Sequence, residues 1–160
     1  MRRIGTLVTG IVIGLLVQSV VGQQRTGMYV NHVGIAVPNV AEALAYYTQK
    51  MGFREAFRQT SQDGKLVSAY VQVSKNSFIE IQEANGQRPA GVSHFGLAVD
   101  SIEDAVTTFR AGGATASDAG APSAFSRARL ANVTDLNGIR IELAELTPDS
   151  LQRKAIESWK

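Results

Sequence analysis

Two stretches of the sequence, Val30-Asn-His-Val-Gly-Ile-Ala-Val37 and Val92-Ser-His-Phe-Gly-Leu-Ala-Val99, match each other at an offset of 62 residues. Both alternate their side chains as a β-strand does, and both carry a histidine at the third position. Over residues 30–43 and 92–105, six positions are identical and no gap is needed. A repeat of this length indicates that the chain contains two copies of one structural unit.

The same offset aligns the end of each unit. Phe78-Ile-Glu-Ile-Gln-Glu83 lies over Arg140-Ile-Glu-Leu-Ala-Glu145, so a glutamate recurs in mid-strand as Glu80 and Glu142. Hydrophobic periodicity and turn residues between these ends predict a strand, a helix and three further strands in each unit. The helices are expected over residues 40–51 and 102–111, and the remaining strands near residues 53–59, 65–73, 77–83, 114–118, 126–133 and 139–145.

These elements divide most of the chain into two modules. The first is predicted over residues 30–91 and the second over residues 92–146, and together they make one α+β domain over residues 30–146. Residues 23–29 are interpreted as a short linker that precedes the first module.

A C-terminal helix is predicted over residues 147–160, after the second module. Thr147 is expected to cap this helix, with Pro148 in its first turn. Apolar side chains at four-residue spacing indicate that the helix packs on the domain; they are Leu151, Ala155 and Trp159.

The first 22 residues predict export. Arg2 and Arg3 precede an apolar stretch over residues 4–22 that ends in small residues, which is the pattern of a secretory signal peptide cleaved before Gln23. The alternative is an uncleaved membrane anchor, in which residues 4–22 are the part that enters the membrane. In both cases the domain is expected outside the cytoplasm, as a periplasmic, secreted or membrane-tethered protein.

Composition excludes several kinds of site and partner. The 160 residues contain no cysteine, which excludes disulfides, thiolate metal sites and cysteine nucleophiles. Of the 16 Lys and Arg residues, Arg2 and Arg3 lie in the signal segment, which leaves 14 basic residues against 14 acidic ones. A net charge near zero gives no electrostatic basis for binding nucleic acid.

The histidine-bearing face of the first strand in each module is expected to border a cleft. Side chains alternate along a strand, so His32 shares its face with Gly34 and Ala36, whereas bulky apolar side chains occupy the opposite face. His94 has the same environment in the second module. Such small neighbours predict open space beside the imidazole, because a core face would be close-packed.

Four residues are predicted to form a metal site. Glu80 and Glu142 lie among apolar residues, and a buried carboxylate needs an arginine, a backbone donor or a metal as its partner. The only two histidines of the chain, His32 and His94, share one repeat position. The alternative interpretation is that both histidines are core residues hydrogen-bonded to backbone carbonyls. The predicted ligands are His32, Glu80, His94 and Glu142.

The motif Val-x-His-x-Gly-[Ile/Leu]-Ala-Val that opens each module, and Asp135-Leu-Asn-Gly-Ile-Arg-Ile-Glu142 near the end of the second, resemble the vicinal oxygen chelate superfamily. This group includes glyoxalase I, methylmalonyl-CoA epimerase, extradiol dioxygenases, and fosfomycin- and bleomycin-resistance proteins. The resemblance covers residues 30–145 and implies two βαβββ modules that form a curved mixed sheet around a metal cleft. It also implies that the ligands come from the first and last strands of the modules, and that the protein forms a homodimer.

The resemblance and the ligand set together predict a metal-dependent enzyme. Two histidines and two glutamates balance the charge of one divalent ion and suit Zn, Ni, Co, Mn or Fe. Among the relatives, this set favours a glyoxalase-type lyase or isomerase that stabilises an enediolate of a small oxygenated substrate. Glu142 or Glu80 is expected to move the proton. Arg140, on the same face as Glu142, is expected to bind a substrate carboxylate or phosphate, and its alternative role is a surface salt bridge.

Two other functions stay open from the sequence. An Fe(II) extradiol dioxygenase of a catechol-like substrate would use two histidines and one carboxylate, and a fourth ligand would block a position that catechol or O2 needs. A non-catalytic small-molecule binding or resistance protein would not need four ligands. Glutathione is not favoured as the substrate, because no arginine follows His32 where glyoxalase I holds the glutathione carboxylate.

Overall fold

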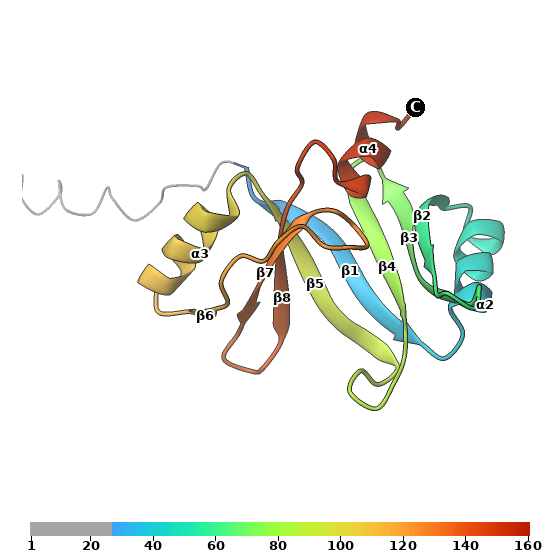
Figure 1. Ribbon diagram of the computed structural model, residues 1–160, viewed down its shortest axis with the longest axis horizontal. Coiled ribbons are helices and arrows are strands. Elements are labelled where there is room, and N and C mark those ends of the chain that lie inside the picture. Colours follow the sequence, from blue (N-terminus) through green and yellow to red (C-terminus); the bar gives the residue numbers. More distant parts are fainter. Residues whose placement is uncertain (1–26) are drawn as a thin grey trace, which may run out of the picture.

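The two histidine-bearing repeats form neighbouring central strands, β1 (Tyr29–Val37) and β5 (Gly91–Val99), which pair in antiparallel fashion. The computed structural model describes residues 27–160 and has one mixed sheet of eight strands, in the order β2-β3-β4-β1-β5-β8-β7-β6. Each module supplies four consecutive strands of this sheet, and α2 and α3 lie at opposite ends of it (Figure 1). The predicted α+β fold with a C-terminal helix is confirmed.

The elements follow the same order in both modules. β1 pairs with β4 in parallel, and β5 pairs with β8 in parallel, so the first and last strands of each module are neighbours. The first module continues with α2 (Val40–Ala45), the π-helical turn η2 (Tyr46–Lys50), β2 (Arg54–Thr60), β3 (Leu66–Ser74) and β4 (Ser77–Glu83). The second continues with α3 (Ile102–Ala111), β6 (Thr115–Ala116), β7 (Arg129–Thr134) and β8 (Arg140–Glu145), and α4 (Leu151–Glu157) ends the fold.

The helices of the two modules begin in the same way. The Asn39 side chain accepts a hydrogen bond from the Glu42 N–H at the start of α2, and Ser101, 62 residues later, accepts one from the Asp104 N–H at the start of α3. These side chains satisfy backbone donors that the helix itself leaves without a partner.

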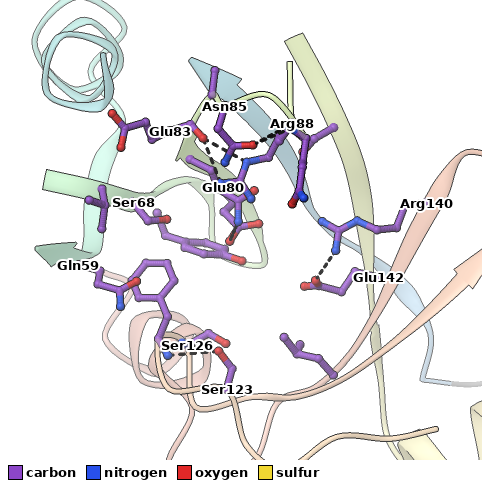
Figure 2. A pocket seen from close by; sticks show the side chains of 18 of the residues that line it. Gln59, Ser68, Glu80, Glu83, Asn85, Arg88, Ser123, Ser126, Arg140 and Glu142 are labelled. Atoms are coloured by element: carbon purple, nitrogen blue, oxygen red, sulfur yellow. Dashed lines mark hydrogen bonds and ion pairs between the residues drawn. The ribbon is translucent and has the colours of Figure 1, made fainter. Parts of the chain in front are cut away.

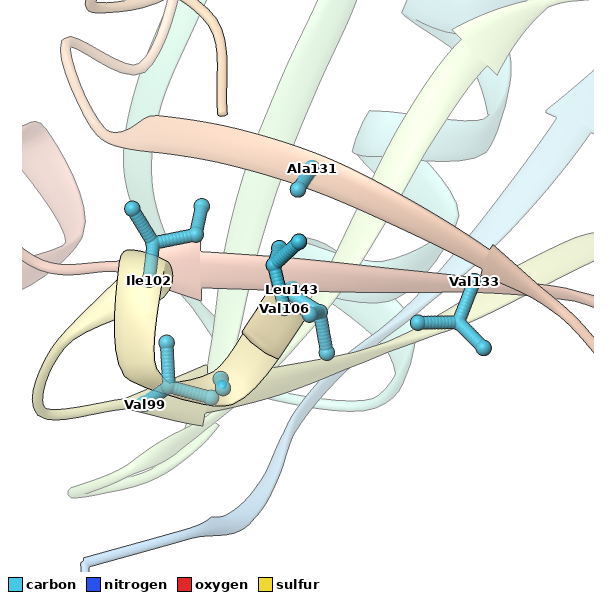
Figure 3. Packing of buried hydrophobic residues seen from close by; sticks show 7 residues of the cluster. Val99, Ile102, Val106, Ala131, Val133 and Leu143 are labelled. Carbon is cyan, nitrogen blue, oxygen red and sulfur yellow. The ribbon is translucent and has the colours of Figure 1, made fainter. Parts of the chain in front are cut away.

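Each helix buries its apolar side against the outer face of its own half-sheet. Val40 and Leu44 of α2 pack on strand residues of the first module. Ile102 and Val106 of α3 pack on Val99 and Leu143 of the second, as Figure 3 shows. The bulky apolar face of each first strand therefore packs against the helix of its module, and the histidines lie on the opposite face.

The structure differs from the sequence-based boundaries where the chain changes its local geometry. The helix expected over residues 40–51 is α-helical only to Ala45 and then continues as the π-helical turn η2, which precedes Gly52 at a φ of +71°. The strands expected near residues 114–118 and 126–133 shorten to β6 and β7, and residues 117–128 form a loop instead. Ser123 organises this loop, because its hydroxyl accepts hydrogen bonds from the N–H groups of Phe125 and Ser126.

The C-terminal helix begins later than expected. Ser150, not Thr147, is its N-cap, and the Ser150 hydroxyl accepts a hydrogen bond from the Arg153 N–H. The Thr147 hydroxyl instead donates to the Arg127 carbonyl. α4 ends at Glu157, so Trp159 lies beyond the helix, where its ring is 5.4 Å from the Arg54 guanidinium.

Within residues 27–160, no helix is long and apolar enough to cross a membrane. The segment interpreted as a signal peptide or anchor, residues 1–22, and most of the predicted linker lie outside the described residues.

Candidate metal centre

The register between β1 and β5 brings the two histidines together. His32 lies opposite Gly96 on the neighbouring strand, and Gly34 lies opposite His94. A Cβ on Gly34 would lie 2.0 Å from Cε1 of His94, and a Cβ on Gly96 would lie 2.0 Å from Cε1 of His32. The space predicted beside each imidazole is therefore not open, because the imidazole of the other module fills it.

The two imidazoles meet edge to face in the interior. The Nε2 atoms of His32 and His94 are 3.1 Å apart, and the planes of the rings are inclined by 81°. Both residues are buried, with exposed fractions of 1% and 2%. Two ring nitrogens so placed can bind one cation together.

Glu80 and Glu142 approach this histidine pair from the parallel strands on either side. In β4, the Oε2 atom of Glu80 lies 3.2 Å from His94 Nε2 and 4.0 Å from His32 Nε2. In β8, the Oε1 atom of Glu142 lies 3.4 Å from His32 Nε2. Each carboxylate is thus close to the histidine of the other module, and the structure brings all four predicted ligands to one place.

The chemistry of these four side chains fits a divalent cation. Ligand atoms of His32, His94 and Glu142 all lie within 4.8 Å of one another. Glu80 contributes a further buried carboxylate, whose Oε2 atom lies 3.2 Å from His94 Nε2. A buried carboxylate charge is costly unless it is compensated, and a cation held between the histidines would compensate it. Two neutral imidazoles and two carboxylates also balance a charge of +2.

The electrostatics of the site keep Glu142 ionised. Burial opposes its ionisation, but the contact with His32 and the neighbouring His94 and Arg140 side chains hold the pKa of Glu142 below its usual value. Burial, reinforced by the charges of Glu80 and Glu142, raises the pKa of the neighbouring Tyr70 hydroxyl well above its usual value. Tyr70 is therefore neutral, and its hydroxyl can donate to an acidic neighbour.

Arg140 lies beside the predicted ligands, as the strand pattern indicated. One guanidinium nitrogen, Nη2, is 2.6 Å from His94 Nδ1. The other, Nη1, donates to Asn132 Oδ1 at 3.2 Å and to Glu142 Oε2 at 3.4 Å. Because the Arg140 side chain is partly exposed, it can also reach a bound molecule.

A cavity of 1130 Å³ opens in front of these side chains (Figure 2). Glu80, Glu142 and Arg140 border it on one side, and Ser123 and Ser126 of the loop between β6 and β7 border it on another. Neither serine was predicted as a site residue: Ser126 was expected at the start of a strand, and Ser123 between two strands. The remaining lining is mostly polar and includes Gln59, Ser68, Tyr70, Gln82, Asn85, Arg88 and Ser93.

The match with a family model decides the classification. The model described as Glyoxalase/Bleomycin resistance protein/Dioxygenase superfamily matches residues 31–133. The chain belongs to this superfamily. The resemblance seen in the repeat motifs is thereby confirmed. No curated protein sequence matches the chain.

Several solved structures are similar to this fold. A hypothetical protein from Bacillus halodurans has a TM-score of 0.64 at 20% identity, over 77% of this chain and 97% of its own. Methylmalonyl-CoA epimerase from Mycobacterium tuberculosis has a TM-score of 0.63 at 22% identity, over 77% and 89%. A Streptomyces coelicolor methylmalonyl-CoA epimerase variant in complex with 2-nitronate-propionyl-CoA has a TM-score of 0.62 at 15% identity, over 78% and 99%. At these identities the likeness concerns the fold.

Proposed function

We propose that this protein is a metal-dependent isomerase or lyase that transfers a proton on the carbon next to a carbonyl group of a small polar substrate. The observation that carries the proposal is the convergence of Glu80 and Glu142 on the His32–His94 pair at the edge of a large polar cavity. The buried Oε2 atom of Glu80 lies 3.2 Å from His94 Nε2, and a cation held between the two would compensate the charge of this carboxylate.

One divalent ion, such as Zn, Ni, Co, Mn or Fe, would be held by His32, Glu80, His94 and Glu142. When bound, such an ion polarises a carbonyl oxygen and stabilises the negative charge that develops there as the neighbouring carbon loses its proton. Four protein ligands leave one or two positions for oxygen atoms of the substrate or of water.

The protein supplies the base from the same pair of carboxylates. Both Glu80 and Glu142 border the cavity, so each can reach a proton on a molecule bound there. Gln82 donates a hydrogen bond to Glu80 Oε1 at 3.0 Å, and Oε2 faces the histidine pair. Glu142 is ionised at neutral pH, because its pKa is held below the usual value. A carboxylate that takes the proton and returns it to a neighbouring carbon completes an isomerisation, whereas inversion at the same carbon needs the other carboxylate to deliver a proton to the opposite face.

The cavity favours a substrate that carries an anionic group. Arg140 borders it beside Glu142, and Arg88 borders it from the segment between the modules, with Nε and Nη2 donating to the Glu83 carbonyl. A guanidinium binds carboxylates and phosphates well. The similar epimerase structures include one in complex with methylmalonyl-CoA, which makes thioesters that carry a carboxylate the first compounds to test.

An Fe(II) extradiol dioxygenase is the second candidate. It is favoured by the tight group of His32, His94 and Glu142, which is a set of two histidines and one carboxylate. Against it stands Glu80 Oε2, at 3.2 Å from His94 Nε2, which would take a position that a catechol or O2 needs. Oxygen uptake with catechols by the Fe(II)-loaded protein distinguishes this candidate.

The deciding experiment measures exchange of the substrate α-proton for deuterium by NMR. Protein loaded with Zn, Ni, Co, Mn or Fe would be incubated in D2O with methylmalonyl-CoA and with the hemithioacetal of methylglyoxal. We expect exchange by the wild type and a rate at least ~100-fold lower for Glu80→Gln or Glu142→Gln, the usual contribution of a general base. Glu145→Gln is the control, because Glu145 is on the same strand but pairs with Arg129. Full activity in both test variants would exclude the mechanism, and binding without turnover by any metal form would favour a binding protein.

We further propose that the mature chain begins at Gln23, acts outside the cytoplasm and forms a homodimer. The first two proposals rest on the basic start and apolar stretch of residues 1–22. N-terminal sequencing of the exported protein tests the cleavage, and sedimentation equilibrium tests the dimer. An intact Met1 or a monomer at micromolar concentration would contradict them.

A further inference from the structure

We propose that Gln152, on the C-terminal helix, is a positioning residue of the metal centre. Through Asn31 it holds the His32 ring in the tautomer whose Nε2 atom can bind a cation. This inference rests on the proposed metal-dependent function and assigns a role to α4, which the sequence analysis interpreted only as a packing element.

A continuous chain of hydrogen bonds links α4 to the histidine pair. Gln152 Nε2 donates to Asn31 Oδ1 at 2.7 Å, although the two residues are 121 apart in sequence. The same Asn31 oxygen lies 3.1 Å from His32 Nδ1. All three side chains are buried, with exposed fractions of 1%, 0% and 1%. Buried polar groups with partners on several elements are held in one geometry.

The orientation of the Asn31 amide follows from its other contact. Asn31 Nδ2 lies 3.4 Å from the Asn76 carbonyl oxygen, which can only accept a hydrogen bond. The amide nitrogen therefore faces Asn76, and Oδ1 faces both Gln152 and His32. A Gln152 side chain that donates to Oδ1 supports the same orientation.

This orientation decides which nitrogen of His32 carries the proton. Since Asn31 Oδ1 is an acceptor, Nδ1 of His32 must be the N–H group, and Nε2 then keeps its lone pair. That lone pair is the one available to a cation, and it lies near His94 Nε2 and Glu142 Oε1. The partner of the second nitrogen of a ligating histidine commonly fixes its tautomer and ring orientation in this way.

The second module has a different arrangement at the equivalent position. Ser93 corresponds to Asn31 in the repeat, and its hydroxyl donates to the Gly34 carbonyl at 3.1 Å while its oxygen lies 2.9 Å from His94 Nδ1. The same His94 Nδ1 atom lies 2.6 Å from Arg140 Nη2, which is only a donor, so this ring lacks the single acceptor that fixes the tautomer of His32. No residue of α4 supports Ser93, because this helix follows the second module and contacts the first. The role of Gln152 is thus particular to His32.

The test compares two buried glutamines that both contact α4. Gln152→Leu removes the donor to Asn31. Gln72→Leu is the matched control, because Gln72 is also 1% exposed and contacts α4 through the Ala155 carbonyl but is not bonded to Asn31. Affinity for Zn²⁺ would be measured by chelator competition, and affinity for Co²⁺ by its absorption spectrum. We expect Gln152→Leu to weaken both about 10- to 100-fold, as loss of such a supporting partner typically does, and Gln72→Leu to leave both unchanged.

Variants of Asn31 and the tautomer itself complete the test. Asn31→Asp keeps an acceptor for His32 Nδ1 and should retain metal affinity, whereas Asn31→Leu should lose it as Gln152→Leu does. Nitrogen-15 NMR of the metal-free wild type should show His32 protonated at Nδ1. This measurement uses the wild type alone, so it is valid even if a variant does not fold. Protonation at Nε2, or unchanged metal affinity in Gln152→Leu, would overturn the inference. A wild type that binds no divalent ion would overturn the proposed function, whereas a wild type that binds the ion with His32 protonated at Nε2 in its metal-free form would overturn this inference alone.

Discussion

The Nε2 atoms of His32 and His94 face each other at 3.1 Å, although the two residues are 62 apart in the sequence. Each module contributes one histidine and one glutamate to this point, and no single module holds a complete set. A cation bound here would therefore join the two halves of the sheet across the β1–β5 pair.

Metal removal should lower the stability of the protein. We expect one divalent ion per chain, measured by plasma mass spectrometry, and none in the double variant His32→Ala/His94→Ala. An ion at 100 times its Kd stabilises the folded state by about 2.7 kcal/mol, so a chelator should lower the Tm of the wild type but not of the double variant. A wild-type Tm that does not respond to the chelator or to added metal would contradict the site.

The two glycines beside the imidazoles should tolerate no side chain. Gly34→Ala places a methyl group 2.0 Å from the His94 ring, and Gly96→Ala does the same to the His32 ring. Such overpacking typically costs about 1–3 kcal/mol, and displacement of either ring should also weaken metal binding. Denaturant unfolding and metal titration measure the two effects.

Gly86→Ala is the control for these glycine variants, because a Cβ there would have no atom within 4 Å. We expect its unfolding free energy and metal affinity to match the wild type. If Gly34→Ala behaved like Gly86→Ala, the close contact between the strands and the rings would be wrong.

Loss of the Arg140 charge should weaken the binding of anions to the metal-loaded protein. A hydrogen bond from a charged donor contributes about 1.5–3 kcal/mol, so Arg140→Gln should raise the Kd for malonate about tenfold or more, measured by calorimetry. Arg110→Gln is the control, because Arg110 pairs with Asp118 on the surface. An equal loss in both variants would show that only the net charge matters.

Removal of the helix cap at Ser150 should destabilise α4. Ser150 is fully buried, and its hydroxyl accepts from the Arg153 N–H, so Ser150→Ala should lower the unfolding free energy by about 1 kcal/mol. Thr147→Ala should cost less, since Thr147 only donates to the Arg127 carbonyl at an exposed position. The reverse order in thermal or denaturant unfolding would restore Thr147 as the cap.

The repeat in the sequence was sufficient to predict the fold and to select the four side chains that meet. Identical positions at one offset indicate two equal modules, and strand alternation places His32 and Glu80 on the inner face of the first. Neither pattern contains the register between β1 and β5. That register places His94 opposite Gly34, so sequence alone suggested open space where an imidazole lies.

Other parts of the site depend on tertiary contacts that leave no local signal. Residues 117–128 form a loop against the cavity rather than strands, and their hydrogen bonds run through the Ser123 hydroxyl. Gln152 occupies a helix position that periodicity alone cannot distinguish from a surface one, and only the fold reveals its contact with Asn31.

The two histidines are equivalent in the repeat, but different residues contact them on the side away from the other histidine. Asn31 and Gln152 lie behind His32, whereas Ser93 and Arg140 lie behind His94. A planar carbon of a substrate bound at this metal centre would have different side chains on its two faces. Proton return from one carboxylate alone would then generate a single enantiomer, whereas proton return from either carboxylate would interconvert the two enantiomers.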